Sequence, residues 1–262
     1  MVAAYPFALA GLLYEALAVV WTHRRFGQRA FVRQVLLQIY FTGVEAAPPV
    51  IMLALAVGGI ATLEGIGGAA ALSGAESLGR VLAVVVLRDI APLLTGSIVI
   101  VRSVTAITAQ LGVMKVQREI EAVELMGLSP TRLLVTPRLL GGLFAFFGLN
   151  VIFNAVALAG GLLVGDLVLS IPPHLLLSAT LSAVEPGHLV AFALKIGLGG
   201  AGIFLVACHH GMAVKRASTQ IPIAVANASL NAFILLLVVH GAISVGSILQ
   251  TVSDLQLSLV PL

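Results

Sequence analysis

Residues 139–165 read LLGGLFAFFGLNVIFNAVALAGGLLVG and contain no charged side chain. About 20 consecutive apolar residues are enough for a helix to cross the hydrocarbon core of a bilayer, so this run predicts a membrane span. The whole chain of 262 residues has the same character, with 60% hydrophobic and only 10% charged residues. Soluble domains carry about 25% charged residues. The composition therefore excludes a soluble globular, disordered or nucleic-acid-binding protein and indicates an integral membrane protein.

Five segments are predicted to cross the membrane, namely residues 46–64, 81–104, 139–165, 189–212 and 225–249. The basic residues support this number. With a cytoplasmic N-terminus, the cytoplasmic stretches 23–45, 112–138 and 213–222 hold four, four and two of the fourteen Lys and Arg residues. The stretches 166–187 and 250–262 hold none. Because basic residues concentrate in cytoplasmic loops, the pattern predicts a cytoplasmic N-terminus and a C-terminus on the opposite side.

The chain is thus predicted to be an all-α membrane protein in three parts. Residues 1–45 form N-terminal interfacial and amphipathic helices, residues 46–250 form the transmembrane domain, and residues 251–262 form a tail on the non-cytoplasmic side. A helix over residues 30–44 would have one apolar face, made of Val32, Val35, Leu36, Ile39 and Gly43. Such a face is typical of a helix that lies in the plane of the membrane.

Two local signals concern helix packing. Pro92 lies within the second span and predicts a kink, which membrane helices tolerate when neighbours satisfy the freed carbonyl group. In the third span, Ala157, Gly161 and Gly165 recur every four residues. This stripe of small residues either lets another helix approach closely or simply reflects the general abundance of glycine in membrane helices.

No catalytic or metal-binding constellation emerges from the sequence. A Walker A loop requires Gly-Lys-Ser/Thr, whereas Lys115, Lys195 and Lys215 are followed by Val, Ile and Arg. The chain is therefore predicted not to be an enzyme. Its single cysteine, Cys208, excludes a disulfide within the chain, and the adjacent His209 and His210 point in different directions on a helix, so no metal site is predicted.

The most unusual segment is 114–127, MKVQREIEAVELMG, in the second predicted cytoplasmic loop. A helix here would have an apolar stripe of Val116, Ile120 and Val123. Its charged residues are Lys115, Arg118, Glu119, Glu121 and Glu124. Two readings stay open at this point: a solvated helix between two spans, or a docking helix that a soluble partner binds.

Four motifs in this region resemble those of one known family, the MlaE/YrbE permeases of MCE-type ABC lipid transporters. They are LRDIAP at 87–92, VRSVTAITAQLG at 101–112, MKVQREIEAVELMG at 114–127 and VTPR at 135–138. Their spacing matches the family without a gap, and weaker similarity extends from about Arg33 to about residue 250. The chain also departs from the family motifs, at Val101, Val104, Gln110, Arg118, Glu119 and Glu121. These departures indicate a divergent or paralogous permease.

The resemblance implies the non-catalytic permease subunit of an ABC transporter, which moves phospholipid or a similar lipid between the inner membrane and the periplasm or outer membrane and so maintains lipid asymmetry. This chain would carry no cofactor, because ATP and Mg²⁺ would bind a separate ATPase subunit like MlaF. The other implied partners are a second permease copy, identical or not, an MCE-domain protein like MlaD, a STAS-domain protein like MlaB, and membrane lipid. The implied location is the bacterial inner membrane, with segment 114–127 as the helix that couples the permease to the ATPase.

Charged residues within the spans are the main candidates for a lipid site. Arg88 and Asp89 occupy the family's Arg–Glu position in the second span, and Lys195 matches a lysine of the fourth. In the family these groups lie near a cavity at the permease dimer interface, which implies contact with a lipid headgroup. Intramembrane ionisable residues usually pair or line a pathway, so a purely structural Arg–Asp pair is the alternative. The first span carries no charge over residues 46–63 and offers Leu55, Ile60 and Leu63 for the acyl chains.

Two other classes of function compete with this reading. One is a stand-alone secondary transporter or channel for a hydrophobic solute, which should show an internal repeat with broken helices in both halves. Five spans do not divide evenly, and no such repeat is evident. The other is a membrane scaffold that transports nothing.

Overall fold

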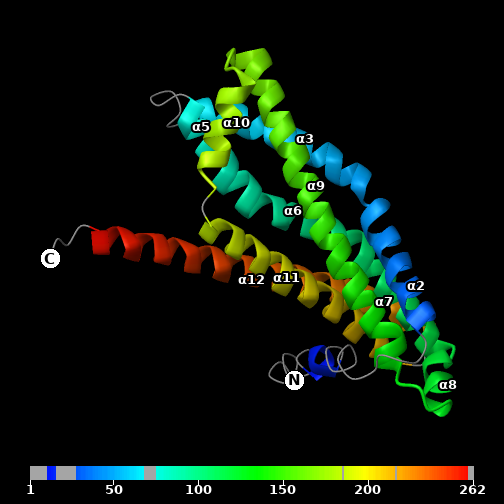
Figure 1. Ribbon diagram of the computed structural model, residues 1–262. Coiled ribbons are helices and arrows are strands. Elements are labelled where there is room, and N and C mark those ends of the chain that lie inside the picture. The colour runs from blue at the N-terminus through cyan, green and yellow to red at the C-terminus, as the bar shows by residue number, and fades with distance from the viewer. Residues whose placement is uncertain (1–10, 16–27, 68–74, 185, 216, 259–262) are drawn as a thin grey trace. The chain divides into compact units, whose positions relative to one another are not determined.

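The computed structural model describes residues 11–15, 28–67, 75–184, 186–215 and 217–258, and within these ranges every regular element is a helix (Figure 1). Five helical runs are long and apolar enough to cross a membrane. They are Phe31–Gly65, Leu78–Val116, Thr131–Val168, Pro186–Met212 and Ser218–Ser247. The predicted all-α membrane fold and its five spans are confirmed.

The first three runs are composite, because α-helices alternate with short π-helical segments. The first contains α2 (Gln28–Ile39), the π-segment Tyr40–Val44 and α3 (Ala47–Gly67). The second contains α5 (Ala75–Val81), the π-segment Leu82–Ile90, α6 (Ala91–Val99), the π-segment Ile100–Val104 and α7 (Thr105–Val116). The short helix α8 (Glu119–Leu125) follows, and the third run contains the π-segment Thr131–Val135 and α9 (Thr136–Leu169).

The remaining helices are α10 (Pro173–Ser182), α11 (Pro186–Met212), the 3-10 turn Ser218–Gln220 and α12 (Ile221–Ser258). Two boundaries differ from the sequence prediction. The helix of the second span continues to Val116 instead of ending near residue 104, and only two turn residues separate the π-segment Tyr40–Val44 from α3. The predicted in-plane helix and the first span are thus almost continuous in the backbone.

The chain packs as two units, each assembled from parts of several helices. The first comprises Met1–Ala46, Gly96–Gly148 and Leu198–Leu236, and the second comprises Ala47–Thr95, Leu149–Gly197 and Leu237–Leu262. In the first unit, buried Phe146 and Phe204 fill the core, and the Thr108 hydroxyl donates a hydrogen bond of 3.2 Å to the Ala207 carbonyl, which joins α7 to α11.

In the second unit, α3 and α9 pack backbone against backbone. A Cβ atom on Gly58 would lie 1.9 Å from the Ala157 carbonyl oxygen, and one on Gly160 would lie 2.6 Å from the Leu55 carbonyl oxygen. Gly161 faces the Thr62 side chain in the same contact. The stripe that begins at Ala157 is therefore a true helix-packing surface, which settles the alternative that the sequence left open.

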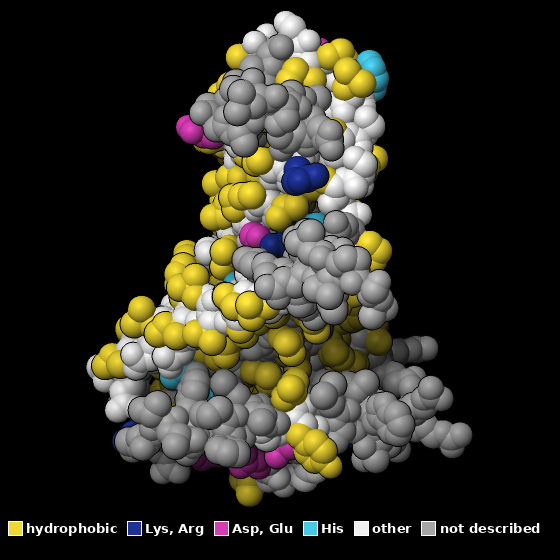
Figure 2. All heavy atoms as spheres, turned by 90° about the vertical axis from the view of Figure 1, so that its left-hand side faces the viewer, with side chains coloured by type: hydrophobic (Ala, Val, Ile, Leu, Met, Phe, Trp, Pro, Cys, Tyr) yellow, Lys and Arg dark blue, Asp and Glu magenta, His cyan; other side chains and the backbone are white. Residues whose placement is uncertain are grey.

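The described surface is that of a membrane protein. Figure 2 shows hydrophobic side chains over most of the visible described surface, with only a few scattered charged groups. A continuous apolar surface of this kind is what a bilayer or another apolar partner covers, and soluble monomers avoid it.

Candidate functional site

The candidate site begins with an irregularity in the second span. Arg88 and Asp89 lie in the π-segment Leu82–Ile90, where the Ala91 N–H bonds to the Val86 carbonyl five residues back. Pro92 explains this geometry, because a proline lacks an N–H group and its ring clashes with the carbonyl four residues earlier, which here belongs to Arg88. π-Turns within α-helices are frequent at functional sites.

Lys195 of α11 satisfies the carbonyl group that Pro92 displaces. Its side chain is fully buried, and its ammonium group donates a hydrogen bond of 3.3 Å to the Arg88 carbonyl oxygen and a second one to the Asp89 carboxylate. The sequence predicted that a neighbouring helix would satisfy this carbonyl, and the structure identifies the donor. Lys195 therefore stabilises both the π-helical backbone at Arg88 and the neighbouring Asp89 carboxylate.

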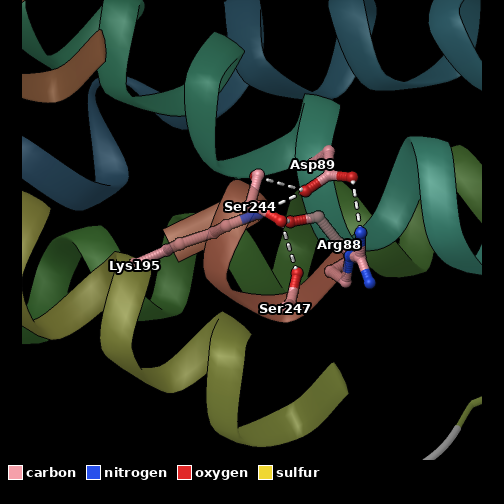
Figure 3. A network of polar contacts seen from close by, with 5 residues as sticks. All are labelled: Arg88, Asp89, Lys195, Ser244 and Ser247. Atoms are coloured by element: carbon pink, nitrogen blue, oxygen red, sulfur yellow. Dashed lines mark hydrogen bonds and ion pairs between the residues drawn. The ribbon is translucent and has the colours of Figure 1, made fainter. Parts of the chain in front are cut away.

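Asp89 is the centre of the network shown in Figure 3. Its carboxylate accepts a hydrogen bond of 3.2 Å from Arg88 Nη2 and one of 3.0 Å from the Ser244 hydroxyl of α12, in addition to the bond from Lys195. The Ser247 hydroxyl in turn donates to the Ser244 carbonyl at 2.8 Å. Three spans, the second, fourth and fifth, thus meet at one carboxylate. We call Arg88, Asp89 and Lys195 the ion triad.

The ion triad carries an excess of positive charge. It combines two cations with one anion, and the side chains of Arg88 and Lys195 are 8% and 0% exposed, whereas that of Asp89 is 31% exposed. Arg88 Nε is buried and has no hydrogen-bond partner in the described part of the chain. A buried donor without an acceptor costs roughly 1–3 kcal/mol, so this guanidinium favours an incoming anionic oxygen.

The structure brings together the three charged residues that the sequence singled out. It also adds Ser244 and Ser247, which the sequence analysis missed. Serines are common in membrane helices and usually bond to their own backbone, so their spacing in the fifth span carried no signal.

The predicted acyl-chain residues of α3 are accessible. Leu55, Ile60 and Leu63 are about half exposed, whereas Ala54 and Thr62 are fully buried. The three predicted side chains are thus open to lipid or to another subunit.

The predicted coupling helix over 114–127 is wrong as a single helix. α7 ends at Val116, Arg118 adopts a left-handed conformation with φ of 61°, and α8 starts at Glu119. A non-glycine residue rarely takes this conformation, and a right-handed helix cannot continue through it. Lys115 therefore belongs to the last turn of α7, and the stripe of Val116, Ile120 and Val123 is interrupted.

α8 nevertheless presents a mixed surface next to this break. Ile120 is buried and holds α8 to the protein, while Glu119 and Glu124 are exposed and Glu121 is half-buried. Leu125 is 89% exposed and is followed by exposed Met126. The loop thus displays acidic and large apolar side chains together.

The histidines of the fourth span take part in helix contacts. His210 Nε2 lies 2.9 Å from the Asn231 side-chain amide of α12, and the rings of His209 and His210 meet edge to face. Among the described residues, no group of three His, Cys, Asp or Glu side chains could hold a metal ion.

Comparison with known proteins adds the family. A family model described as "Permease MlaE" matches residues 35–245. A "Probable ABC transporter permease protein" of Rickettsia felis is 25% identical over 79% of this chain and 80% of its own length. The "Intermembrane phospholipid transport system permease protein MlaE" of Haemophilus influenzae is 30% identical over 49% of each chain. "Protein TRIGALACTOSYLDIACYLGLYCEROL 1, chloroplastic" of Arabidopsis thaliana is 27% identical over 69% of this chain and 51% of its own length.

Proposed function

The chain belongs to the MlaE permease family, and from this premise we propose that it is the membrane-spanning, non-catalytic subunit of an ABC transporter that moves phospholipid or a similar lipid. The family match over most of the chain carries this proposal. The name of the Haemophilus relative, which describes intermembrane phospholipid transport, supports the cargo. The proposed route lies between the inner membrane and the periplasm or outer membrane.

The lipid headgroup binds at Arg88 in this proposal. A guanidinium presents a planar fork of donors that matches two phosphate oxygens at once. The Nε atom of Arg88 is buried, and no described residue accepts a hydrogen bond from it. The ion triad to which Arg88 belongs has one net positive charge. A phosphate group would complete both the charge balance and the hydrogen bonding of this site.

Asp89 and Lys195 act as positioning residues. Asp89 holds Nη2 of Arg88 while the site is empty, and Lys195 holds Asp89 and the Arg88 backbone. The ion triad thereby keeps the guanidinium oriented at low exposure, where its interaction with an anion is less screened than in water. The exposed side chains of Leu55, Ile60 and Leu63 in α3 receive the acyl chains.

The transporter in this proposal contains two permease copies, identical or related, since one five-span chain without a P-loop needs partners for ATP-driven transport. A MlaF-like ATPase binds on the cytoplasmic side, an MCE-domain protein like MlaD lies on the opposite side, and a MlaB-like STAS-domain protein accompanies the ATPase. α8 is the contact for the ATPase, because it combines acidic groups with exposed Leu125 and Met126. Interface cores favour large apolar side chains of this kind, with charges at the rim.

The proposed location is the bacterial inner membrane. The five spans make this a multi-pass membrane protein. The concentration of basic residues in 23–45, 112–138 and 213–222 supports a cytoplasmic N-terminus and a periplasmic C-terminus.

Transport by Arg88 variants tests the headgroup role. In liposomes that contain the permease and its co-purifying ATPase, Arg88→Ala should reduce lipid transport and photo-cross-linking by at least about tenfold, and Arg88→Lys should recover only part of the loss. The matched control is Arg80→Ala, which removes an exposed arginine of α5 in the same helical run.

The alternative, a purely structural ion triad, gives a different result. Arg88→Ala and Arg88→Lys would then lower thermal stability together with transport, and Arg88→Ala combined with Asp89→Ala would restore folding and transport. A well-folded Arg88→Ala protein that transports lipid at the wild-type rate contradicts the headgroup role.

A pull-down experiment tests the contact with the ATPase. Replacing Leu125 and Glu124 of α8 by Ala and Lys should lower co-purification of the ATPase without changing membrane insertion, because both side chains are exposed. Glu64→Lys at the far end of the first span is the matched charge control. ATPase recovery at the wild-type level from the α8 variant would show that this loop is only solvated.

A further inference from the structure

A cavity of about 380 Å³ with a mixed polar and apolar lining lies wholly within the first unit and contains no residue of the ion triad. Its walls come from three places in the chain: 34–45 in and after α2, 102–114 at the end of the second span, and 134–138 at the start of the third span. Small-molecule sites commonly have volumes of roughly 300–1,000 Å³. The cavity is therefore large enough for a lipid headgroup or a soluble phosphate ester.

An ion pair fixes one wall of this cavity. Arg102 Nη2 lies 2.7 Å from Glu45 Oε2, and Nη1 of the same guanidinium donates to the Glu45 carbonyl oxygen. The pair neutralises Glu45, the one acidic side chain among the described residues that line the cavity. It also ties the π-segment Tyr40–Val44, which Glu45 directly follows, to the π-segment Ile100–Val104, which contains Arg102.

Several hydrogen-bond donors that line the cavity have no acceptor among the described residues. Arg138 uses one of its N–H groups for the Leu134 carbonyl at 2.9 Å, and no other described residue accepts from this guanidinium. The side-chain amides of Gln34 and Gln110 line the same cavity and bond to no described residue. With Arg102 and Glu45 paired, Arg138 gives the described residues of the lining one net positive charge.

We propose that this cavity binds the phosphate group of an anionic lipid, at a site separate from the ion triad. Unused guanidinium and amide N–H groups around one excess positive charge fit phosphate oxygens. The other lining residues make the site amphiphilic, because Leu37 and Phe41 border it and are themselves about half exposed. A lipid satisfies both parts, whereas a free phosphate satisfies only the donors. This binding does not depend on the proposed transport function.

Photo-cross-linking tests the site directly. The full chain, with any subunits that accompany it, is purified in maltoside micelles and exposed to photoreactive phosphatidylglycerol or to diacylglycerol with the same photoreactive chains. We expect adducts of phosphatidylglycerol, but not of diacylglycerol, on peptides from 34–45, 102–114 or 134–138. Millimolar inorganic phosphate should not displace the adduct. Displacement by phosphate would identify a soluble phosphate ligand and overturn the lipid proposal.

Four variants test the site further. Arg138→Gln removes the free guanidinium, and Ala106→Phe fills the cavity while it keeps both arginines. Each should lower the cavity adduct by at least about tenfold, the effect of losing a charge-assisted contact. Arg33→Gln is the matched control, since Arg33 is an exposed basic residue of α2 outside the cavity. The Arg88→Ala variant should retain the adduct, which separates this site from the ion triad.

The opposite outcomes overturn the proposal. An adduct that persists in both Arg138→Gln and Ala106→Phe places the lipid elsewhere. An equal loss in Arg33→Gln means that the lipid responds only to the general positive charge of this region. Circular dichroism and thermal unfolding of Ala106→Phe check that the protein is folded, and adduct loss in a folded Ala106→Phe protein supports the site even if Arg138→Gln does not fold.

Discussion

The two ion clusters in the described part of this protein contain the same kinds of group in opposite surroundings. The ion triad of the second unit holds Arg88 and Lys195 almost without exposure around one carboxylate, and its members come from two spans. The Glu45–Arg102 pair of the first unit is 37% and 41% exposed. A buried ion network costs several kcal/mol when one partner is lost, whereas an exposed pair contributes at most about 1 kcal/mol. We therefore expect the ion triad to determine stability and the exposed pair to determine mainly local order.

The largest effect is expected from Asp89→Asn. This change leaves Arg88 and Lys195 as two buried cations without their shared anion, so the unfolding free energy should fall by about 3–5 kcal/mol. Thermal unfolding in detergent, followed by tryptophan fluorescence or circular dichroism, measures it. Combining Asp89→Asn with Lys195→Met removes one cation and should recover part of the loss. If the Asp89→Asn protein were as stable as the wild type, the buried ion triad would contribute no more to stability than the exposed pair.

A double-mutant cycle between Lys195 and Pro92 tests a smaller part of the same cluster. Lys195→Met deprives the Arg88 carbonyl of the donor that Pro92 makes necessary. In a Pro92→Ala background, the new N–H group of residue 92 can bond to that carbonyl, so Lys195→Met should cost less there. We expect a coupling of about 1 kcal/mol, the net value of one hydrogen bond. Additive unfolding free energies would mean that Lys195 acts only through Asp89.

The smallest effect is expected from Glu45→Gln in the exposed pair. The loss should be less than about 1 kcal/mol and should shrink further in high salt, because exposed charges are screened. Unfolding midpoints at low and high salt measure both quantities. Repeating them with Asp89→Asn gives the matched comparison, since a half-buried carboxylate in an ion network is screened less. A Glu45→Gln effect as large as that of Asp89→Asn would contradict the role of burial.

Much of the architecture was predictable because a membrane constrains helix length and loop charge. The five spans and the contact of Arg88 with Asp89 follow from hydropathy and adjacency, whereas the packing role of the stripe at Ala157 was one of two readings that the sequence left open. The bond from Lys195 to Asp89 was not predictable. Helices that are apolar on all sides give no periodic signal for their rotation, so the face of the fourth span that meets the second could not be derived.

The coupling segment shows a different limit. Its residues have a helical pattern throughout, yet Arg118 breaks the helix in the left-handed region. Arginine has no special preference for that conformation, unlike glycine or asparagine, so no residue type marked the break. The cavity around Arg138 could not be predicted either, since its lining comes from three separate stretches of the sequence.

The contact at Gly58 and Ala157 limits how this protein can move. Side chains that interdigitate can change rotamer and let two helices slide, but here one backbone touches another, with no rotatable group at the point of contact. If α3 slid or rolled against α9 by even a fraction of an ångström, carbonyl oxygens of one helix would clash with Cα atoms of the other. These parts of the two helices consequently form one rigid body. Any conformational change during a transport cycle therefore has to occur at other helix contacts, while these parts of α3 and α9 move together.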